Sequence, residues 1–270
     1  MICVSQRQVT LLLLLAISIG CGRTDRASTP EPPKPESALS VDDSEPAQPE
    51  KLSHEIIDWA AVEGLPEEIA LFNHVFWEPN DTLSLRQLLR TTDLVKGRSV
   101  LEIGTGTGIV ALCCAQAGAA KVIATDINPW AIRNCMFNAK QLKFDKRIEL
   151  RQVSQKSPDA WSVIGPKERF DVIVSNPPWE PGSPTRVEDF AFYDPDFQLM
   201  KSLVTNLPNH VKPNGRVFLA YGCVTAIRKL QSLTTDHGMT FTVHDDRSLD
   251  DLTENFLPGM LIEIHTANAR

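Results

Sequence analysis

The sequence of 270 residues predicts an α/β fold in which a doubly wound sheet of seven strands ends in one antiparallel strand. Short apolar segments alternate with helical patterns throughout residues 97–270, which is typical of parallel βα units. A glycine-rich turn at 104–108 follows the first apolar segment, as in Rossmann-like folds. A polar loop, and no helix, separates the last two segments, Phe241–Asp245 and Met260–Thr266, so we expect an antiparallel hairpin there. Sheets of this kind bind ligands at the carboxyl ends of their strands.

The other elements follow from apolar runs that end at turn residues. Pro195 lies near the start of one helical pattern and Pro213 follows it, which fits the positions that proline tolerates. The expected helices are Ile109–Ala117, a helix from Pro129, a helix from Asp194 to about His210, and Val224–Leu233. The expected strands before the hairpin are Val100–Ile103, Lys121–Asp126, Ile148–Val153, Phe170–Ser175 and Arg216–Tyr221.

The turn after the first strand carries the pattern E-x-G-x-G-x-G, which begins at Glu102. Its glycines, Gly104, Gly106 and Gly108, allow a tight turn and a close approach of the backbone to a ligand. The dinucleotide-binding pattern G-x-G-x-x-G would place its third glycine at position 109, where this chain has Ile109. The turn therefore departs from the dinucleotide pattern, and the alternative to a ligand-binding turn is an α/β turn with no ligand.

Two further strand ends carry polar residues. The second strand ends in Asp126, about twenty residues after the glycines, where a carboxylate can accept hydrogen bonds from both ribose hydroxyls. Ile127 would lie against the adenine face, and Asn128 is the expected cap of the next helix.

The fourth strand ends in Asn176-Pro177-Pro178-Trp179. The side-chain carbonyl of Asn176 and the backbone carbonyl of Pro177 can hold both N–H groups of a planar nitrogen, on which Trp179 can stack. The alternative is an ordinary Asn-Pro turn.

These motifs resemble those of class I S-adenosylmethionine (SAM) methyltransferases, and N-P-P-aromatic is similar to their motif IV. The segment Val75-Phe76-Trp77-Glu78-Pro79-Asn80-Asp81-Thr82 resembles the one that lies over the cofactor in the HemK/PrmC protein glutamine methyltransferases. The resemblance covers roughly residues 76–221 and implies a class I methyltransferase fold, SAM as cofactor and no metal. It implies catalytic roles for Asn176, Pro177 and Trp179, and cofactor binding by Glu102, Gly104, Thr105, Gly106, Gly108, Asp126, Ile127 and Asn176.

The chain departs from the family pattern at three places. Trp179 stands where the family usually has tyrosine, and Ser154 and Gln155 are the candidates for the residue that meets the adenine amine. The segment Glu180–Asp194 has no match, and we expect it to form part of the acceptor pocket.

The N-terminal quarter predicts an export sequence and a linker. Residues 1–21 carry an apolar run and Ser18-Ile19-Gly20-Cys21, which resembles a lipoprotein cleavage site. A lipidated Cys21 would anchor the chain to the bacterial cell envelope; without processing, the chain would stay in the cytoplasm. Residues 22–50 are rich in Pro, Glu and Ser and predict a disordered tether.

Residues 51–96 are expected to be helical. The pattern predicts short helices at Leu52–Val62 and Pro66–Phe72, and a longer one to about Thr92 that is capped by Asp81. The six cysteines include no C-x-x-C pair, so we expect buried thiols and no metal site.

The function expected from these features is transfer of a methyl group to a planar amide or amine nitrogen, with a protein glutamine as the favoured acceptor. The net charge is −7 and no basic stripe is present, which argues weakly against a nucleic acid substrate. Two alternatives remain open: a methyltransferase for exocyclic amines of RNA or DNA bases, and a noncatalytic SAM-fold domain on a lipid tether.

Overall fold

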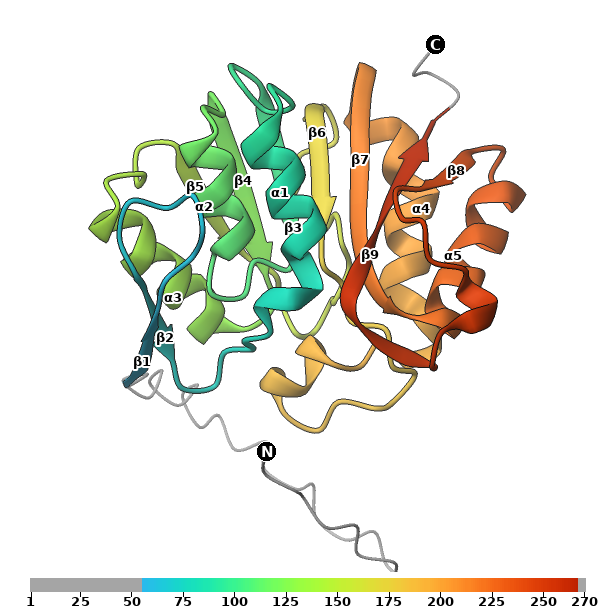
Figure 1. Ribbon diagram of the computed structural model, residues 1–270, viewed down its shortest axis with the longest axis horizontal. Coiled ribbons are helices and arrows are strands. Elements are labelled where there is room, and N and C mark those ends of the chain that lie inside the picture. Colours follow the sequence, from blue (N-terminus) through green and yellow to red (C-terminus); the bar gives the residue numbers. More distant parts are fainter. Residues whose placement is uncertain (1–54, 267–270) are drawn as a thin grey trace, which may run out of the picture. The chain divides into compact units, whose positions relative to one another are not determined.

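The computed structural model describes residues 55–266, so the predicted export sequence, Cys21 and the tether lie outside the described part. A seven-stranded sheet has the order β5-β4-β3-β6-β7-β9-β8, and β9 runs antiparallel to both of its neighbours, β7 and β8 (Figure 1). The predicted fold class is confirmed. Among the described residues, no helix is long and apolar enough to cross a bilayer. The strands are β3 (Ser99–Ile103), β4 (Lys121–Asp126), β5 (Ile148–Gln152), β6 (Phe170–Ser175), β7 (Val211–Cys223), β8 (Thr240–Val243) and β9 (Asn255–His265).

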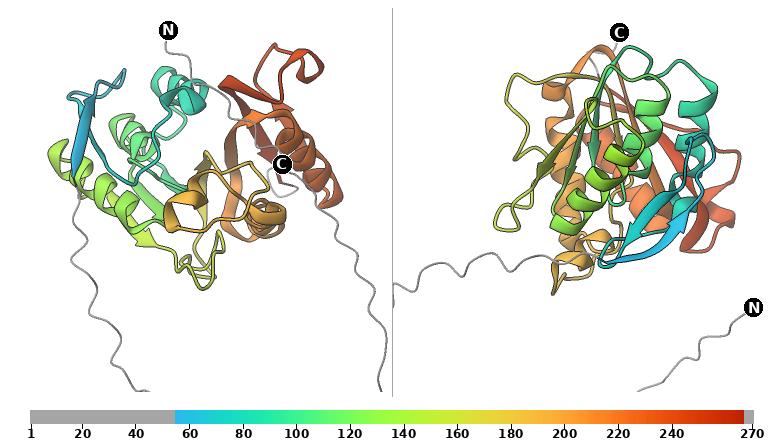
Figure 2. Two further views of the ribbon diagram at one scale, coloured as in Figure 1. Left: turned by 90° about the horizontal axis from the view of Figure 1, so that it is seen from below. Right: turned by 90° about the vertical axis from the view of Figure 1, so that its left-hand side faces the viewer.

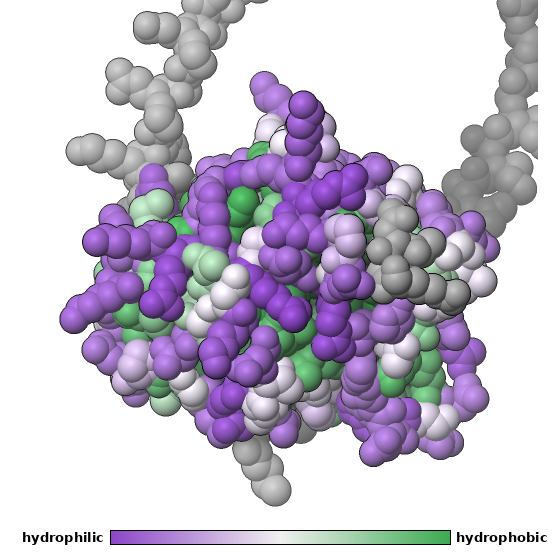
Figure 3. All heavy atoms as spheres, turned by 90° about the horizontal axis from the view of Figure 1, so that it is seen from above, coloured by the Kyte–Doolittle hydropathy of each residue, from purple (hydrophilic) through white to green (hydrophobic). Residues whose placement is uncertain are grey.

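Helices cover both faces of the sheet, as Figures 1 and 2 show. Successive residues of a strand point to opposite faces, so Val100 of β3 joins one apolar cluster and Leu101 joins the other. The loop that follows β6 lies at the carboxyl ends of the parallel strands (Figure 1), and the opposite end of the sheet is mainly hydrophilic (Figure 3). One face carries α1 (Leu83–Thr91), α2 (Ile109–Gln116) and α3 (Pro129–Gln141), and the other carries α4 (Gln198–His210) and α5 (Val224–Asp236).

The prediction of two short helices before residue 73 is wrong. The chain forms an antiparallel hairpin of β1 (Ile56–Ala60) and β2 (Ile69–Phe72) in its place. Two side chains of α3 hold β2: Asn138 accepts a hydrogen bond from the backbone N–H of Ala70 at 2.8 Å, and Asn134 accepts one from that of Phe72 at 3.1 Å. These tertiary contacts fix an extended backbone where the local apolar pattern favours a helix.

Asp81 does not cap a helix, contrary to the prediction. It lies inside a 3₁₀ helix, η1 (Pro79–Thr82), and Thr82 is the residue that precedes α1. The backbone N–H of Asn80 is capped by the side chain of Glu78 at 3.0 Å. The Asp81 carboxylate is therefore left for another contact.

Several boundaries differ from the sequence prediction. β7 begins at Val211, and residues 212–215 bulge out between the pairs Phe170–Val211 and Val172–Arg216. A 3₁₀ turn, η3 (Pro195–Phe197), precedes α4, and β9 begins at Asn255. Cys223 ends a strand and is not in a helix. The expected cap of α3 is confirmed, because Asn128 accepts a hydrogen bond from Trp130 N–H at 2.9 Å.

Candidate active site

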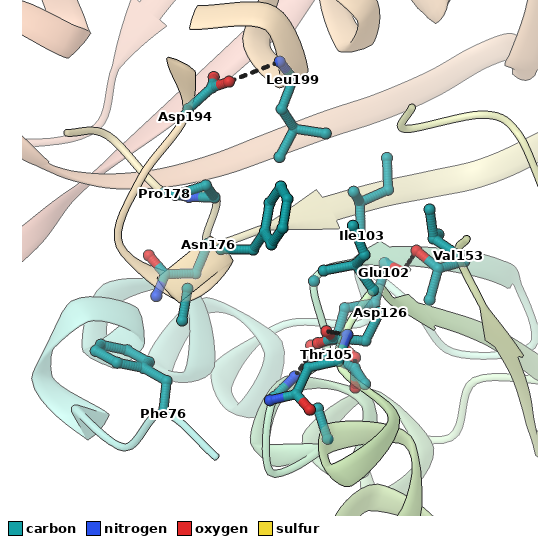
Figure 4. A pocket seen from close by; sticks show the side chains of 18 of the residues that line it. Phe76, Glu102, Ile103, Thr105, Asp126, Val153, Asn176, Pro178, Asp194 and Leu199 are labelled. Atoms are coloured by element: carbon teal, nitrogen blue, oxygen red, sulfur yellow. Dashed lines mark hydrogen bonds between the residues drawn. The ribbon is translucent and has the colours of Figure 1, made fainter. Parts of the chain in front are cut away.

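Three neighbouring strands bring the predicted site residues together. The sheet order places β3 between β4 and β6, so Glu102, Asp126 and Asn176 meet at one edge of the sheet. They line one cavity of about 300 Å³, with Asp126 and Thr105 on one side and Asn176 and Phe76 on the other (Figure 4). The other predicted cofactor residues on its wall are Gly104, Thr105, Gly106 and Ile127.

Asp126 holds the glycine turn in place. Its carboxylate accepts hydrogen bonds from Gly106 N–H at 2.9 Å and from Asn128 N–H at 2.8 Å. Gly104 and Gly106 adopt left-handed backbone angles, with φ of 78° and 55°, which favour glycine. Burial raises the pKa of Asp126 above its ordinary value, and these backbone donors oppose that shift. The strand end and the glycine turn thus form one preorganised unit.

Glu102 is a carboxyl group held in an apolar setting. Only 2% of its surface is exposed, and Thr105 donates its hydroxyl proton to Glu102 Oε2 at 2.6 Å. Burial raises the pKa of Glu102 to about 8, the Thr105 hydrogen bond lowers it, and the negative charge of Asp126 raises it further. A cation placed beside Glu102 would restore its charged form.

Gly108, a predicted cofactor contact, does not line the cavity. Its φ is 87°, and a Cβ atom there would lie 2.5 Å from the Cys135 sulfur. Close packing of α2 against α3 explains this glycine. Ser154 and Gln155 are also absent from the wall, which at this point is made by Val153 and by the segment 158–160.

The segment before η1 covers the cavity from the other side. Phe76 and Trp77 line it, and the His74 carbonyl accepts a hydrogen bond from Asn128 Nδ2 at 2.7 Å. The ring of Phe76 meets Phe192 edge-on, with 5.3 Å between centroids. The loop 180–194 therefore closes over the same space as residues 74–79, and it includes a 3₁₀ helix, η2 (Val187–Ala191).

A second pocket of about 840 Å³ adjoins the first. It contains the other two predicted catalytic residues, Pro177 and Trp179, and Asn176 lines both pockets. None of the described residues that line it is Lys or Arg, whereas Glu78, Asp81 and Glu180 are acidic. Its remaining lining residues include Phe192, Gly222, Asn255, Phe256 and Leu257.

Asn176 carries an unsatisfied acceptor at the boundary between the pockets. Its Oδ1 is buried and has no hydrogen-bond partner among the described residues, and its Nδ2 lies 3.5 Å from Asp81 Oδ2. A buried carbonyl without a partner costs free energy that a ligand N–H group can recover. Asn176 is thus suited to accept a hydrogen bond from a bound group.

Comparisons with known proteins agree with this geometry. The family model described as ribosomal protein L11 methyltransferase (PrmA) matches residues 80–177. A putative protein N5-glutamine methyltransferase of Methanocaldococcus jannaschii is 31% identical over 182 residues, which cover 64% of this chain and 85% of the relative. A release factor glutamine methyltransferase of Cereibacter sphaeroides is 32% identical, and the match covers 46% of each chain.

Two further matches are a relative named as a tRNA methyltransferase and a solved structure with the same fold. A tRNA1(Val) (adenine(37)-N6)-methyltransferase of a Flavobacteriaceae bacterium is 29% identical, over 46% of this chain and 51% of the relative. The chain thus spans about half the length of this relative and of the release factor enzyme. A solved structure of a putative SAM-dependent methyltransferase from Streptococcus mutans superposes with a TM-score of 0.56 at 14% identity, covering 77% of this chain and 55% of the other, which shows a shared fold.

The fold, the cavity and these relatives define a class I SAM-dependent methyltransferase, with SAM as its cofactor. Within that class the chain belongs to the HemK/PrmC-like family, because the M. jannaschii relative is matched over most of its length. The resemblance seen in the motifs is confirmed, and the noncatalytic alternative loses its support.

The sequence did not indicate every part of the second pocket. Asp81 was assigned to a helix end, and Gly222 and the segment 255–257 had no assigned role. A Pro-Asn-Asp-Thr turn gives no indication that its carboxylate faces a residue far along the chain. Only the antiparallel packing of β9 beside β7 brings residues 255–257 to this edge.

Proposed function

We propose that this methyltransferase acts on the planar amide nitrogen of a protein glutamine side chain. The observation that carries the proposal is the buried, unpartnered Oδ1 of Asn176, which lies where the two pockets adjoin. The name of the M. jannaschii relative supports glutamine as the acceptor. Together they suggest that the 300 Å³ cavity takes the cofactor and the larger pocket takes the acceptor.

The cavity residues fit the three parts of SAM. The buried carboxyl of Glu102 suits the ammonium group, because an adjacent cation stabilises a carboxylate that burial alone keeps protonated. Asp126 suits the ribose hydroxyls, and Ile127 the adenine face. Val153 and Asp159 line the cavity and would take the place next to adenine that the sequence assigned to Ser154 and Gln155.

The acceptor residues explain how a weak nucleophile can react. The bound cofactor supplies an electrophilic methyl group. An amide nitrogen has a delocalised lone pair, so positioning and hydrogen bonding must provide most of the rate enhancement. Asn176 Oδ1 and the Pro177 carbonyl would accept its two N–H groups, and Trp179 would cover its plane. Because alignment of the nitrogen provides most of the rate enhancement, this mechanism does not need a strong base to activate the nitrogen first.

The charge of the larger pocket favours a protein over a nucleic acid. Three carboxylates and no Lys or Arg line it among the described residues, so a phosphate group would be repelled there. The second candidate is an exocyclic base amine, which has the same planar N–H₂ geometry. The adenine-N6 relative favours that candidate.

Activity toward a panel of three acceptors distinguishes the glutamine candidate from the base-amine candidate. The full-length protein would be incubated with methyl-labelled SAM and a purified release factor, ribosomal protein L11 or unmodified tRNA. We expect label on a protein, located on a glutamine side chain by mass spectrometry and lost when that glutamine is changed to alanine. Label on tRNA alone would establish the base-amine activity, and the absence of label from all three would contradict both candidates.

A further inference from the structure

Asp81 is a buried carboxylate that the fold itself does not use. It is 2% exposed, and within residues 55–266 its side chain has one hydrogen-bond contact, the 3.5 Å approach of Asn176 Nδ2. Its Oδ1 is buried without a partner. By contrast, the buried Asp194 accepts two backbone N–H groups at the start of α4, from Leu199 at 2.8 Å and from Met200 at 3.0 Å. Asp194 therefore stabilises a helix end, and Asp81 does not.

The backbone keeps Asp81 in this position. A Cβ atom on Gly259 of β9 would lie 2.6 Å from the Asp81 carbonyl, so the two segments are in close contact. From the other side, Arg86 of α1 donates a hydrogen bond to the Pro79 carbonyl at 2.8 Å. The 3₁₀ helix η1 is thus fixed between β9 and α1, which holds the backbone of Asp81 in place beside Asn176.

An ionised carboxylate has no proton to donate, so it distinguishes the two ends of an amide group. Only the NH₂ end of Asn176 can face Asp81 favourably, since the carbonyl end would place two oxygens together. We propose that ionised Asp81 is a positioning residue, which holds the Asn176 side chain with its NH₂ group toward η1 and keeps Oδ1 for the N–H group of the acceptor. The inference rests on the proposed function, because it needs Oδ1 to be the group that receives the acceptor nitrogen.

Protonation of Asp81 should remove this preference. Burial raises the pKa of Asp81 to about 6, the hydrogen bond from Asn176 lowers it, and the charge of Glu78 raises it further. A protonated Asp81 can donate to Oδ1, so both orientations of the Asn176 amide become favourable. Glu78 and Glu180 share the larger pocket with Asp81, and Arg86 lies behind η1. The preference is therefore present above pH 6 and lost below it.

The test measures the Asn176 amide directly and needs no acceptor. Full-length protein labelled with ¹⁵N-asparagine and saturated with SAM would be titrated by NMR, with the Asn176 side-chain resonances assigned by their loss in Asn176→Ser. We expect them to shift with a midpoint near pH 6 in the wild type. The shift should vanish in Asp81→Asn and persist in Asp93→Asn, an exposed acid with the same change of charge. Resonances that do not titrate in the wild type would overturn the inference, even if Asp81→Asn fails to fold.

A second, kinetic test uses whichever of the three acceptors named above is methylated. For Asp81→Asn we expect kcat to fall about 10-fold, with the acid limb of its pH profile abolished and SAM affinity retained. An unchanged kcat, or an acid limb that persists, would contradict a positioning role. If no acceptor is methylated, the proposed function fails and the NMR titration still decides whether Asp81 orients Asn176.

Discussion

The cofactor side and the acceptor side of Asn176 are assembled in different ways. The cofactor side takes Glu102, the glycine turn and Asp126 from two consecutive βα units, and hydrogen bonds within these units fix their geometry. The acceptor side takes residues 75–81, 176–180 and 191–192 together with Gly222 and the segment 255–257. The wall that carries Glu102, the glycine turn and Asp126 is therefore encoded by local spacing, whereas the cover of the cofactor cavity and the acceptor side depend on the packing of distant segments.

This difference affects how each side should respond to substitution. A local unit with several internal hydrogen bonds keeps its shape when one contact to a ligand is lost. A pocket made of distant segments has unsatisfied atoms, such as the Oδ1 atoms of Asp81 and Asn176, that await a ligand. We expect changes on the cofactor side to alter binding, and changes on the acceptor side to alter turnover.

The largest effect on turnover is expected at Asn176, which lies at the boundary between the two pockets. Asn176→Ala should lower kcat by ~100- to 1000-fold, because it removes a group that holds the reacting nitrogen, as for an oxyanion-hole donor. SAM affinity, measured by calorimetry, should change little. Asn206→Ala on α4 is the control, since within residues 55–266 its side chain donates one hydrogen bond, to the Ser202 carbonyl. Equal losses in affinity and turnover would remove the distinction between the two sides.

A substitution at Gly108 tests whether this motif glycine is needed for the packing of α2 against α3 and not for cofactor binding. Gly108→Ala should lower the free energy of unfolding by ~2–4 kcal/mol, from a strained φ and a contact with Cys135. Gly118→Ala is a matched control, because its φ of 89° is similar but its nearest neighbour would be 3.6 Å away. It should cost ~1 kcal/mol. Urea unfolding measures both, and equal costs would rule out the Cys135 contact as the cause.

Asp126→Ala should weaken SAM binding by ~10- to 100-fold, or ~1.4–2.7 kcal/mol. The substitution removes the proposed ribose contact and also the acceptor for Gly106 N–H. Titration calorimetry measures the change, and Asp145→Ala, an exposed acid, is the control. Unaltered affinity would refute the assigned ribose contact.

The smallest effect is expected in the number of protons that the protein releases when the cofactor binds. With the pKa of Glu102 at about 8, this group is ~90% protonated at pH 7 before the cofactor binds. A cofactor ammonium beside it favours the charged form, so binding should release close to one proton. Calorimetry in two buffers with different ionisation enthalpies gives the number. Glu102→Gln should release none, and a wild-type value near zero would place the ammonium elsewhere.

The sequence predicted the large sheet, and it singled out Glu102, the glycine turn and Asp126, which line one cavity, because these features depend on short-range patterns. The strand that carries Glu102, the turn and the acid at the end of β4 keep fixed spacings along the chain. The β1–β2 hairpin was missed, since Asn134 and Asn138 hold β2 from more than sixty residues away. Asp81 was misassigned for the same reason: its partner, Asn176, is distant in sequence.

Asn176 is expected to stand between the cofactor and the acceptor. A crystal structure of the full-length protein with S-adenosylhomocysteine tests this directly, because that product marks where the methyl group departed. We expect the ribose on Asp126, the sulfur directed toward the Asn176 side of the cavity, and the pocket around Trp179 left open. A ligand whose sulfur is directed away from Asn176, or which fills the pocket around Trp179, would contradict the account.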